Sequence, residues 1–402
     1  MLLKEKIKLV IESQRENLLR SEKGIQREVN AEPYNSFALI ITGIRRSGKS
    51  TFLSQLIEKQ NKWYYLNLED PRLSAFESDD FIKAEEIMYD LYGDEGVFFF
   101  DEIQVVQHWE KFIRYLVDKK VKVVITGSNA NMLSRELGTL LTGRHIQLEI
   151  FPFSYTEYLK ILNQKESVES LQNYLWTGGF PEFVKLGNTD ILHQLLTDII
   201  YKDIVVRYGL KNVDTIKNLA IFLLSNVAKE FSYNAIKGFL QVKSVQSVID
   251  YMEYLENAYI TFTIPRFSYS YKQQIANPKK IYAIDNGFIL ANSTSFSKDS
   301  GRILENMVFL ELRKKYKQIY YYKEQIECDF VVKKKDTIAM AIQVCYEIHD
   351  ENQIREINGL LAALNKFNLD IGQIITFEQD DELIIEGKTI QIVSLLKWVR
   401  NF

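Results

Sequence analysis

The stretch Gly43-Ile-Arg-Arg-Ser-Gly-Lys-Ser50 decides how this chain folds, because it follows the apolar run Phe37 to Ile41 and precedes a helical pattern from Thr51 to about Gln60. It matches the pattern G-x-x-x-x-G-K-[ST], in which a glycine-rich turn between a strand and a helix turns backbone N–H groups toward phosphate oxygens. The positive end of the helix faces the same point. The sequence therefore predicts an α/β domain with a parallel sheet and a nucleotide phosphate site.

Each residue type in this loop has a physical reason to be there. Gly43 and Gly48 allow backbone conformations that a side chain would forbid, Lys49 adds positive charge, and the Ser50 hydroxyl suits Mg²⁺. The residues predicted to contact the nucleotide are Gly43, Ile44, Arg45, Arg46, Ser47, Gly48, Lys49, Ser50, Thr51 and, further along the chain, Ser128.

A second apolar strand, Val97 to Phe100, delivers the adjacent carboxylates of Asp101 and Glu102. A continuous apolar run is typical of a parallel strand that is buried on both faces. Idle Asp-Glu pairs are normally found on exposed loops, because burial of an unpaired charge is costly. We therefore expect Asp101 to reach the metal ion through its water shell, and Glu102 to polarise the water that attacks the γ-phosphate.

Two further segments offer polar side chains to this site. The strand Val121 to Thr126 leads into Ser128 and Asn129, which would hydrogen-bond the γ-phosphate or the attacking water; the alternative is an ordinary turn. Arg144 lies on a short loop before the strand His145 to Ile150. It would complete the site of a neighbouring subunit, or it is an exposed arginine without a role in catalysis.

Together these segments resemble the AAA+ superfamily of ATPases, and within it the bacterial and archaeal group whose ATPase module carries a long tail. The resemblance implies ATP binding, Mg²⁺ dependence and self-association into a homo-oligomer. Guanine is disfavoured, since no N-K-x-D motif follows the third strand. The matching segments are Gly43 to Ser50, Tyr65-Leu-Asn-Leu-Glu-Asp-Pro71, Phe99-Phe-Asp-Glu-Ile-Gln104, Thr126-Gly-Ser-Asn-Ala130, Leu141-Thr-Gly-Arg144, Phe151-Pro-Phe-Ser154 and Gly178-Gly-Phe-Pro-Glu182.

Composition fits a cytoplasmic, multidomain enzyme. The 402 residues exceed what one core accommodates, and 50 Lys plus Arg against 53 Asp plus Glu leave no overall basic bias toward nucleic acid. The only cysteines are Cys328 and Cys345, which argues against a disulfide framework. No apolar run approaches membrane-spanning length, and the four histidines lack metal-ligand spacing. We expect neither membrane insertion nor secretion.

Pattern and resemblance together divide the chain into five parts. The lid is the region that the family carries after its ATPase module. The expected parts are an N-terminal helix at 1–30, the P-loop AAA+ ATPase domain at 31–155, a helical lid at 156–210, a winged helix at 211–292 and a small α/β nuclease-like domain at 293–402.

The order of elements after residue 210 is that of a winged helix, a variant of helix-turn-helix. Helical patterns at 216–230, 233–240 and 244–255 are followed by strands at 259–265 and 280–284 that flank a polar tip. In a DNA-binding interpretation, Lys243 and Gln246 begin the third helix and enter a major groove, while Lys272, Lys279 and Lys280 on the wing contact phosphates. The alternative is an interdomain scaffold that contacts no DNA.

The last segment looks like the PD-(D/E)XK nuclease fold. A working member carries a helix glutamate, a strand aspartate, and then an acidic residue and a lysine two positions apart, which bind Mg²⁺ and position a water. Glu305 and Asp329 match the first two, but Gln343 and Cys345 stand where the second carboxylate and the lysine are needed. We therefore predict a degenerate nuclease domain that binds rather than cuts.

Three functions of different classes remain open at this point. The first is a DNA-associated ATPase that remodels or regulates a complex. The second is a nucleotide switch of the STAND type, which assembles on ATP binding and resets on hydrolysis. The third is a metal-dependent DNA nuclease regulated by ATP. Turnover stimulated by DNA, slow turnover with ATP-driven assembly, and cleavage products would distinguish them.

Overall fold

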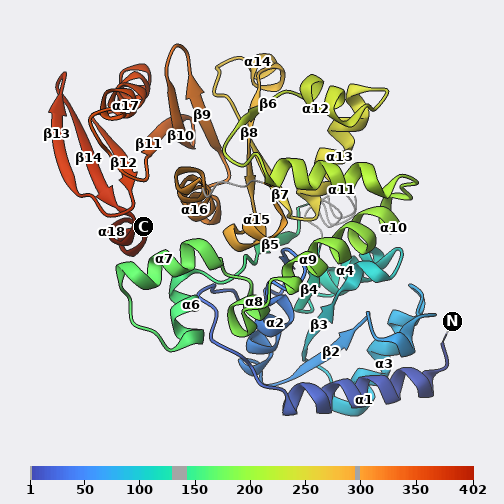
Figure 1. Ribbon diagram of the computed structural model, residues 1–402. Helices are drawn as coiled ribbons and strands as arrows, with labels where there is room; N and C mark the ends of the chain where they lie inside the picture. Colours follow the sequence, from blue (N-terminus) through green and yellow to red (C-terminus); the bar gives the residue numbers. More distant parts are fainter. Residues whose placement is uncertain (1, 129–142, 295–298) are drawn as a thin grey trace. The chain divides into compact units, whose positions relative to one another are not determined.

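The computed structural model describes residues 2–128, 143–294 and 299–402. It consists of two compact units, Met1–Pro152 and Phe153–Phe402. Each unit has its own sheet structure (Figure 1). Each unit also has its own apolar core.

The sheet of the first unit is parallel throughout and has the strand order β2-β3-β4-β1-β5. Every residue of β1, β3 and β4 is buried, as the continuous apolar runs of the sequence predict. Because β1 and β3 are both parallel to β4, which lies between them, the loops that follow β1 and β3 emerge at the same edge of the sheet. The strands are β1 (Ala38–Thr42), β2 (Trp63–Asn67), β3 (Val97–Asp101), β4 (Val123–Gly127) and β5 (His145–Glu149).

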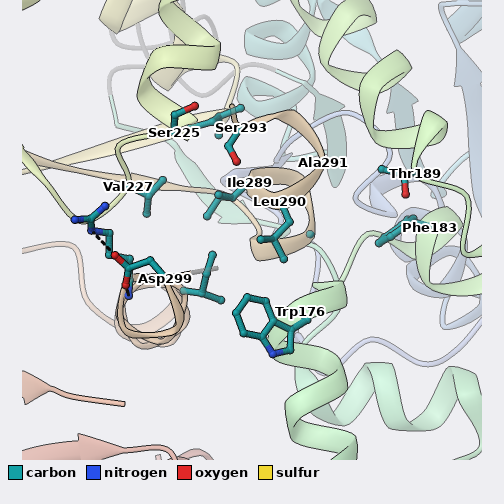
Figure 2. Close-up of a pocket in the computed structure, with 14 residues that line it drawn as sticks. Trp176, Phe183, Thr189, Ser225, Val227, Ile289, Leu290, Ala291, Ser293 and Asp299 are labelled. Atoms are coloured by element: carbon teal, nitrogen blue, oxygen red, sulfur yellow. Dashed lines mark hydrogen bonds and ion pairs between the residues drawn. The ribbon is translucent and has the colours of Figure 1, made fainter. Parts of the chain in front are cut away.

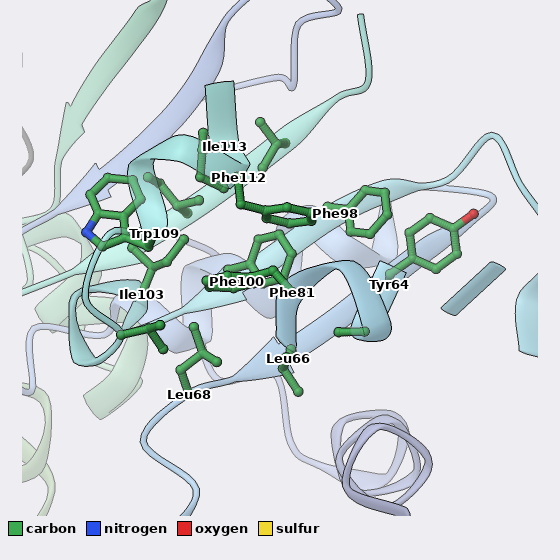
Figure 3. Close-up of a cluster of buried hydrophobic side chains, with 14 of the residues drawn as sticks. Tyr64, Leu66, Leu68, Phe81, Phe98, Phe100, Ile103, Trp109, Phe112 and Ile113 are labelled. Atoms are coloured by element: carbon green, nitrogen blue, oxygen red, sulfur yellow. The ribbon is translucent and has the colours of Figure 1, made fainter. Parts of the chain in front are cut away.

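Side chains alternate along these strands and fill an apolar core on each face of the sheet. On one face, Phe98 and Phe100 pack with Phe81 and Phe112, whose rings stack at a centroid distance of 4.8 Å (Figure 3). On the other face, Phe99 packs with side chains of α2. The helices of this unit are α1 (Lys4–Arg20), α2 (Lys49–Glu58), η1 (Pro71–Leu73), α3 (Asp80–Tyr92), η2 (Ile103–Val105) and α4 (Trp109–Asp118).

The second unit begins with a run of short helices. Ser154 and Ser167 cap the first two, each accepting a hydrogen bond from the backbone N–H three residues on, and Gly178 to Pro181 form the turn that follows. The helices are α6 (Tyr155–Leu162), α7 (Val168–Thr177), α8 (Pro181–Leu186), α9 (Asp190–Asp198), the π-helix η3 (Ile199–Val205) and α10 (Val206–Tyr208).

Three helices and a small antiparallel sheet of order β6-β8-β7 come next. The sequence predicts a polar loop between the two longer strands, β7 and β8. This prediction is wrong in one respect, because the segment contains the helix α14, which Ser270 caps by accepting a hydrogen bond from the backbone N–H of Gln273. The elements are α11 (Val213–Leu224), β6 (Glu230–Phe231), α12 (Tyr233–Leu240), α13 (Val245–Asn257), β7 (Thr261–Pro265), α14 (Tyr271–Ala276), β8 (Lys279–Ala283) and α15 (Asn286–Asn292).

The last part is built on a mixed sheet of order β13-β14-β12-β11-β10-β9, with α17 against its centre (Figure 1). Cys328 belongs to the apolar core between this sheet and α17. In the described parts of the chain, no helix is both long and apolar enough to span a bilayer. The elements are α16 (Ser300–Lys315), β9 (Ile319–Lys323), β10 (Glu327–Lys334), β11 (Thr337–Val344), α17 (Gln353–Phe367), β12 (Ile371–Thr376), β13 (Asp381–Ile385), β14 (Lys388–Ser394) and α18 (Leu395–Asn401).

Candidate functional site

The loop between β1 and α2 has a backbone that only glycine accommodates at two points. Gly43 has φ +148°, and a Cβ atom there would lie 2.1 Å from the carbonyl oxygen of Ile150. Gly48 has φ +93°, and its Cβ would lie 2.9 Å from Nη1 of Arg27. Both glycines of the sequence motif are therefore required by the conformation of this loop.

Lys49 links this loop to the acidic residues after β3. Its side chain is buried, and Nζ donates hydrogen bonds of 3.1 Å to the carbonyl oxygens of Gly43 and Ile44. The same Nζ lies 3.8 Å from Oε1 of Glu102. The two segments that the sequence predicts to form one site therefore meet at the carboxyl edge of the sheet.

The Thr126 hydroxyl fixes both acidic residues. It donates to Oδ1 of Asp101 and accepts from the backbone N–H of Glu102 at 2.9 Å. Glu102 has φ +53°, a left-handed conformation that turns its side chain away from the strand direction. Gln104 donates to Oε2 of Glu102, and Tyr65 donates to Oδ2 of Asp101 at 3.2 Å. The two carboxylates are thus held separately and point in different directions.

The surroundings of the Asp101 carboxylate would suit a bound divalent cation. Burial, followed by the negative charge of Glu102, raises the pKa of Asp101, while hydrogen bonds from Thr126 and Ser50 and the charge of Lys49 oppose that rise. A divalent cation beside Ser50 and Asp101 would favour the ionised carboxylate, and both residues offer the oxygen ligands that Mg²⁺ prefers.

One polar atom in the loop itself has no hydrogen-bond partner among the described residues. Ser47 is fully buried, and its Oγ is left unpaired. Since buried hydroxyls are normally satisfied, this atom marks a place where a ligand oxygen fits. The loop and the acidic residues therefore fit a phosphate group together with a divalent cation.

Sequence reasoning missed Arg27, which supports the loop from the segment before β1. Arg27 is buried; it donates from Nη1 to the Ser47 carbonyl and from Nη2 to the Phe151 carbonyl, both at 2.7 Å. Its backbone N–H donates to Gln55 in α2 at 3.2 Å. No motif surrounds Arg27, so the sequence offered no signal for it.

The other residues that the sequence predicts to contact the nucleotide differ in their contacts and in their solvent exposure. Arg45 pairs with Glu69 at 3.2 Å, and the buried Ser128 lies 3.5 Å from the amide of Gln104. Asn129 lies outside the described residues. Ile44 is buried, Arg46 is exposed and Thr51 is half-buried.

Arg144 is distant from the loop of its own chain. It precedes β5, whose first residue His145 is aligned with Ala38 at the start of β1, whereas the loop follows the end of β1. Arg144 is therefore level with Phe37, and at about 3.3 Å per residue the separation along the strand between Arg144 and Gly43 is roughly 20 Å. Its side chain is 55% exposed and pairs with Asp118 at 2.7 Å. Arg144 is therefore available on the surface at the opposite edge of the sheet.

The residues predicted to contact DNA differ in their solvent exposure. Lys243, Gln246 and Lys272 are exposed, and the half-buried Lys279 donates to the Tyr233 hydroxyl at 2.8 Å. The prediction that Lys280 contacts DNA phosphates is wrong. Lys280 is 1% exposed, because β8 turns its side chain inward toward the carboxylates of α16 and β10.

The nuclease-like residues Glu305 and Asp329 are brought together by α16 and β10, and both contact Nζ of Lys280. The motif position of the lysine holds Cys345, but Lys280, which lies outside the motif, provides an ammonium group to this cluster. Gln343 and Cys345 border the same polar cavity of about 910 Å³. Burial raises the pKa of the Cys345 thiol to about 11.

A second cavity of about 460 Å³ lies elsewhere in the second unit, and Figure 2 shows the side chains around it. Trp176, Ile289 and Leu290 give it a mainly apolar wall, and an ion pair of 3.2 Å between Asp299 and Arg302 borders it. None of the predicted site residues lines this cavity.

Comparison with known families divides the chain into three matched regions. Residues 35–159 match the AAA domain family. Residues 168–299 and 300–398 match two domains of unknown function, DUF8612 and DUF4143. A DNA polymerase III gamma subunit-related protein from Thermotoga maritima matches over 62% of this chain and 99% of its own. Its sequence identity to this chain is 11% and its TM-score is 0.26.

Two curated relatives match over most of their length. Uncharacterized protein MJ1544 of Methanocaldococcus jannaschii is 34% identical over 413 residues, which cover 95% of this chain and 92% of that protein. An uncharacterized protein of Haemophilus influenzae is 30% identical over 384 residues, which cover 90% of this chain and 94% of that protein. The chain therefore belongs to the same protein family as these two relatives, and its N-terminal part is a P-loop AAA domain.

Proposed function

We propose that the protein binds ATP with Mg²⁺ at the loop Gly43–Ser50 and hydrolyses it. The observation that carries this proposal is the distance of 3.8 Å between Nζ of Lys49 and Oε1 of Glu102, which joins a phosphate-binding loop to a buried carboxylate. The match to the AAA domain family supports nucleotide binding.

The side chains have separate roles in this proposal. Lys49 leaves the carbonyl oxygens of Gly43 and Ile44 and binds the phosphates, where it neutralises charge. Ser50 and Asp101 hold the Mg²⁺ ion, which supplies charge neutralisation at the phosphates. Gln104 and Thr126 orient Glu102. The Glu102 carboxylate accepts a hydrogen bond from the attacking water and polarises it.

Arg144 acts between subunits in this proposal. Its position at the edge of the sheet opposite the loop excludes direct contact with the nucleotide of its own chain, and its exposed side chain is accessible to a second copy. An arginine supplied in trans stabilises charge that develops on the phosphates. Hydrolysis would then require a homo-oligomer.

We further propose that the protein is a DNA-associated remodelling or regulatory ATPase whose tail binds rather than cuts. The helices α11, α12 and α13 and the sheet β6-β8-β7 support a winged-helix module, and exposed Lys243, Gln246 and Lys272 support a DNA-facing surface. Since Lys280 is buried, phosphate contacts by the wing would rest on Lys272 and Lys279.

The experiment is a steady-state ATPase assay of the full-length protein with and without duplex DNA, run beside sizing of the Glu102→Gln variant in ATP. DNA-stimulated turnover supports the proposal. Very slow turnover with ATP-driven assembly would favour the nucleotide switch instead. Nicked plasmid that disappears with Asp329→Ala would establish the nuclease. Absence of any ATP hydrolysis in the presence of DNA and Mg²⁺ would contradict the ATPase proposal.

A further inference from the structure

A buried lysine lies at the centre of the acidic cluster in the second unit. Nζ of Lys280 is 2.7 Å from Oε1 of Glu327, 2.9 Å from Oε1 of Glu305 and 2.9 Å from Oδ1 of Asp329. The side chain of Lys280 is 2% exposed. An ammonium group has three N–H donors, so these carboxylates satisfy it completely.

The carboxylates come from two different elements and converge on one point. Glu305 lies on α16, whereas Glu327 and Asp329 lie at the start of β10 on the same side of the strand. Lys280 reaches this point from β8, which belongs to a different sheet. Oxygen ligands that converge in this way are typical of a cation site, and here the cation is part of the chain.

Further protein donors contact the carboxylates of this cluster. The Tyr282 hydroxyl donates to Oε1 of Glu305 at 2.7 Å, and the N–H of Val344 donates to Oδ2 of Asp329 at 3.0 Å. Lys323 lies 3.3 Å from Oε2 of Glu327. Five of the six carboxylate oxygens thus contact a protein donor, and the three acidic residues also border the polar cavity of about 910 Å³.

Gln343 does not provide a replacement metal ligand. Its Oε1 accepts the backbone N–H of Asp329 at 3.2 Å, and its Nε2 donates to Oε2 of Glu356 at 2.7 Å. Among the residues that the structure describes, no group of three or more His, Cys, Asp or Glu side chains is arranged to hold a metal ion. The divalent cation that a PD-(D/E)XK nuclease needs therefore does not fit the residues present.

We propose that the Lys280 ammonium takes the place of a divalent cation in this cluster, so that the site is permanently metal-free and fastens β8 to α16 and β10. A PD-(D/E)XK nuclease obtains the positive charge at this position from a bound metal ion, whereas in this chain Lys280 supplies it. Removal of a partner from a buried ion cluster leaves uncompensated charge, so the three carboxylates require a cation, which is the Lys280 ammonium in this chain. This proposal is independent of nucleotide hydrolysis by the AAA domain.

The test measures Mn²⁺ binding to the nucleotide-free, full-length protein. The electron paramagnetic resonance signal of free Mn²⁺ reports how much of the added ion stays unbound. Carboxylate oxygens suit Mn²⁺ as they suit Mg²⁺. Lys280→Met removes the ammonium while keeping an unbranched chain, and we expect it to bind one Mn²⁺ more than the wild type. The matched control is Lys279→Met, whose lysine contacts Tyr233 outside the cluster and whose Mn²⁺ binding should equal that of the wild type.

Two further variants test whether Asp329 is a ligand of the additional Mn²⁺ site. Asp329→Asn in the Lys280→Met background should abolish the additional Mn²⁺ site, because a cluster ligand is lost. Asp329→Asn alone should leave Mn²⁺ binding unchanged, and this variant decides the matter if Lys280→Met does not fold. Loss of a bound Mn²⁺ on Asp329→Asn alone would overturn the proposal, as would a folded Lys280→Met protein that gains no Mn²⁺ site.

Discussion

Replacement of Glu102 by glutamine separates binding of ATP from its hydrolysis. Glutamine keeps the shape of the side chain and an oxygen that accepts from Gln104, but it loses the charge that polarises water. General-base catalysis contributes about 10²- to 10⁴-fold in rate. We therefore expect hydrolysis to slow by this factor, which corresponds to about 3 to 5 kcal/mol in the activation barrier.

The geometry also predicts what happens to ATP affinity. Lys49 and Glu102 lie 3.8 Å apart in a buried setting, which at an effective dielectric constant of about 20 corresponds to about 4 kcal/mol of gross attraction. Glu102→Gln removes this attraction and also a negative charge near the phosphates. The ammonium is then freer to bind phosphate, so ATP should bind equally tightly or more tightly.

The assay pairs equilibrium binding of ATP with single-turnover hydrolysis of a radiolabelled substrate. The control is Glu85→Gln, because Glu85 is also buried and lies 3.3 Å from a lysine, Lys119, but belongs to α3 rather than to the loop or the strand end beside it. That control should keep both affinity and rate. The reasoning is refuted if Glu102→Gln hydrolyses ATP at the wild-type rate, or if it loses affinity as severely as it loses turnover.

Three further predictions concern other residues. Arg144→Ala should keep nucleotide affinity but lose turnover by on the order of a thousandfold, and mixing with Glu102→Gln chains should restore part of it; no restoration would contradict a role in trans. Arg27→Met should lower the free energy of unfolding by about 1–3 kcal/mol per lost hydrogen bond and weaken ATP binding, as denaturant and ligand titrations would show. Burial raises the pKa of Asp285 to about 6 from its usual 3.8, so the folded state holds the extra proton between these values. The free energy of unfolding should therefore fall by about 3 kcal/mol as pH rises from 4 through 6, and Asp285→Asn should lack this slope in denaturant titrations.

The P-loop and the acidic strand could be predicted because their chemistry is local. The spacing of Gly43, Gly48 and Lys49 is contiguous in sequence, and Val97 to Phe100 is apolar without interruption, which indicates a buried parallel strand. Parallel strands deliver their following loops to one edge, so the proximity of Lys49 and Asp101 followed from the strand assignment alone.

Alternation along a strand was equally informative in the tail. Neighbouring residues of a strand point to opposite faces, and Cys328 and Asp329 lie on opposite sides of β10 accordingly. Cys328 lies in the apolar core with α17, whereas Asp329 lies against Lys280.

The residues that could not be predicted act through tertiary contacts. In the sequence, Lys280 resembles an ordinary basic residue near the start of a strand, and its burial follows from tertiary contacts with carboxylates of α16 and β10. Arg27 reaches the loop across 20 positions in sequence, with no motif around it. The helix α14 is short enough that local pattern does not distinguish it from a polar loop.

The most direct test of the central claim is calorimetric titration of the full-length protein with ATP in the presence of Mg²⁺, with Lys49→Ala beside it. The account predicts saturable binding by the wild type that Lys49→Ala loses while its fold, followed by circular dichroism, is unchanged. Absence of ATP binding by the wild type, or equal binding by the two proteins, would contradict it.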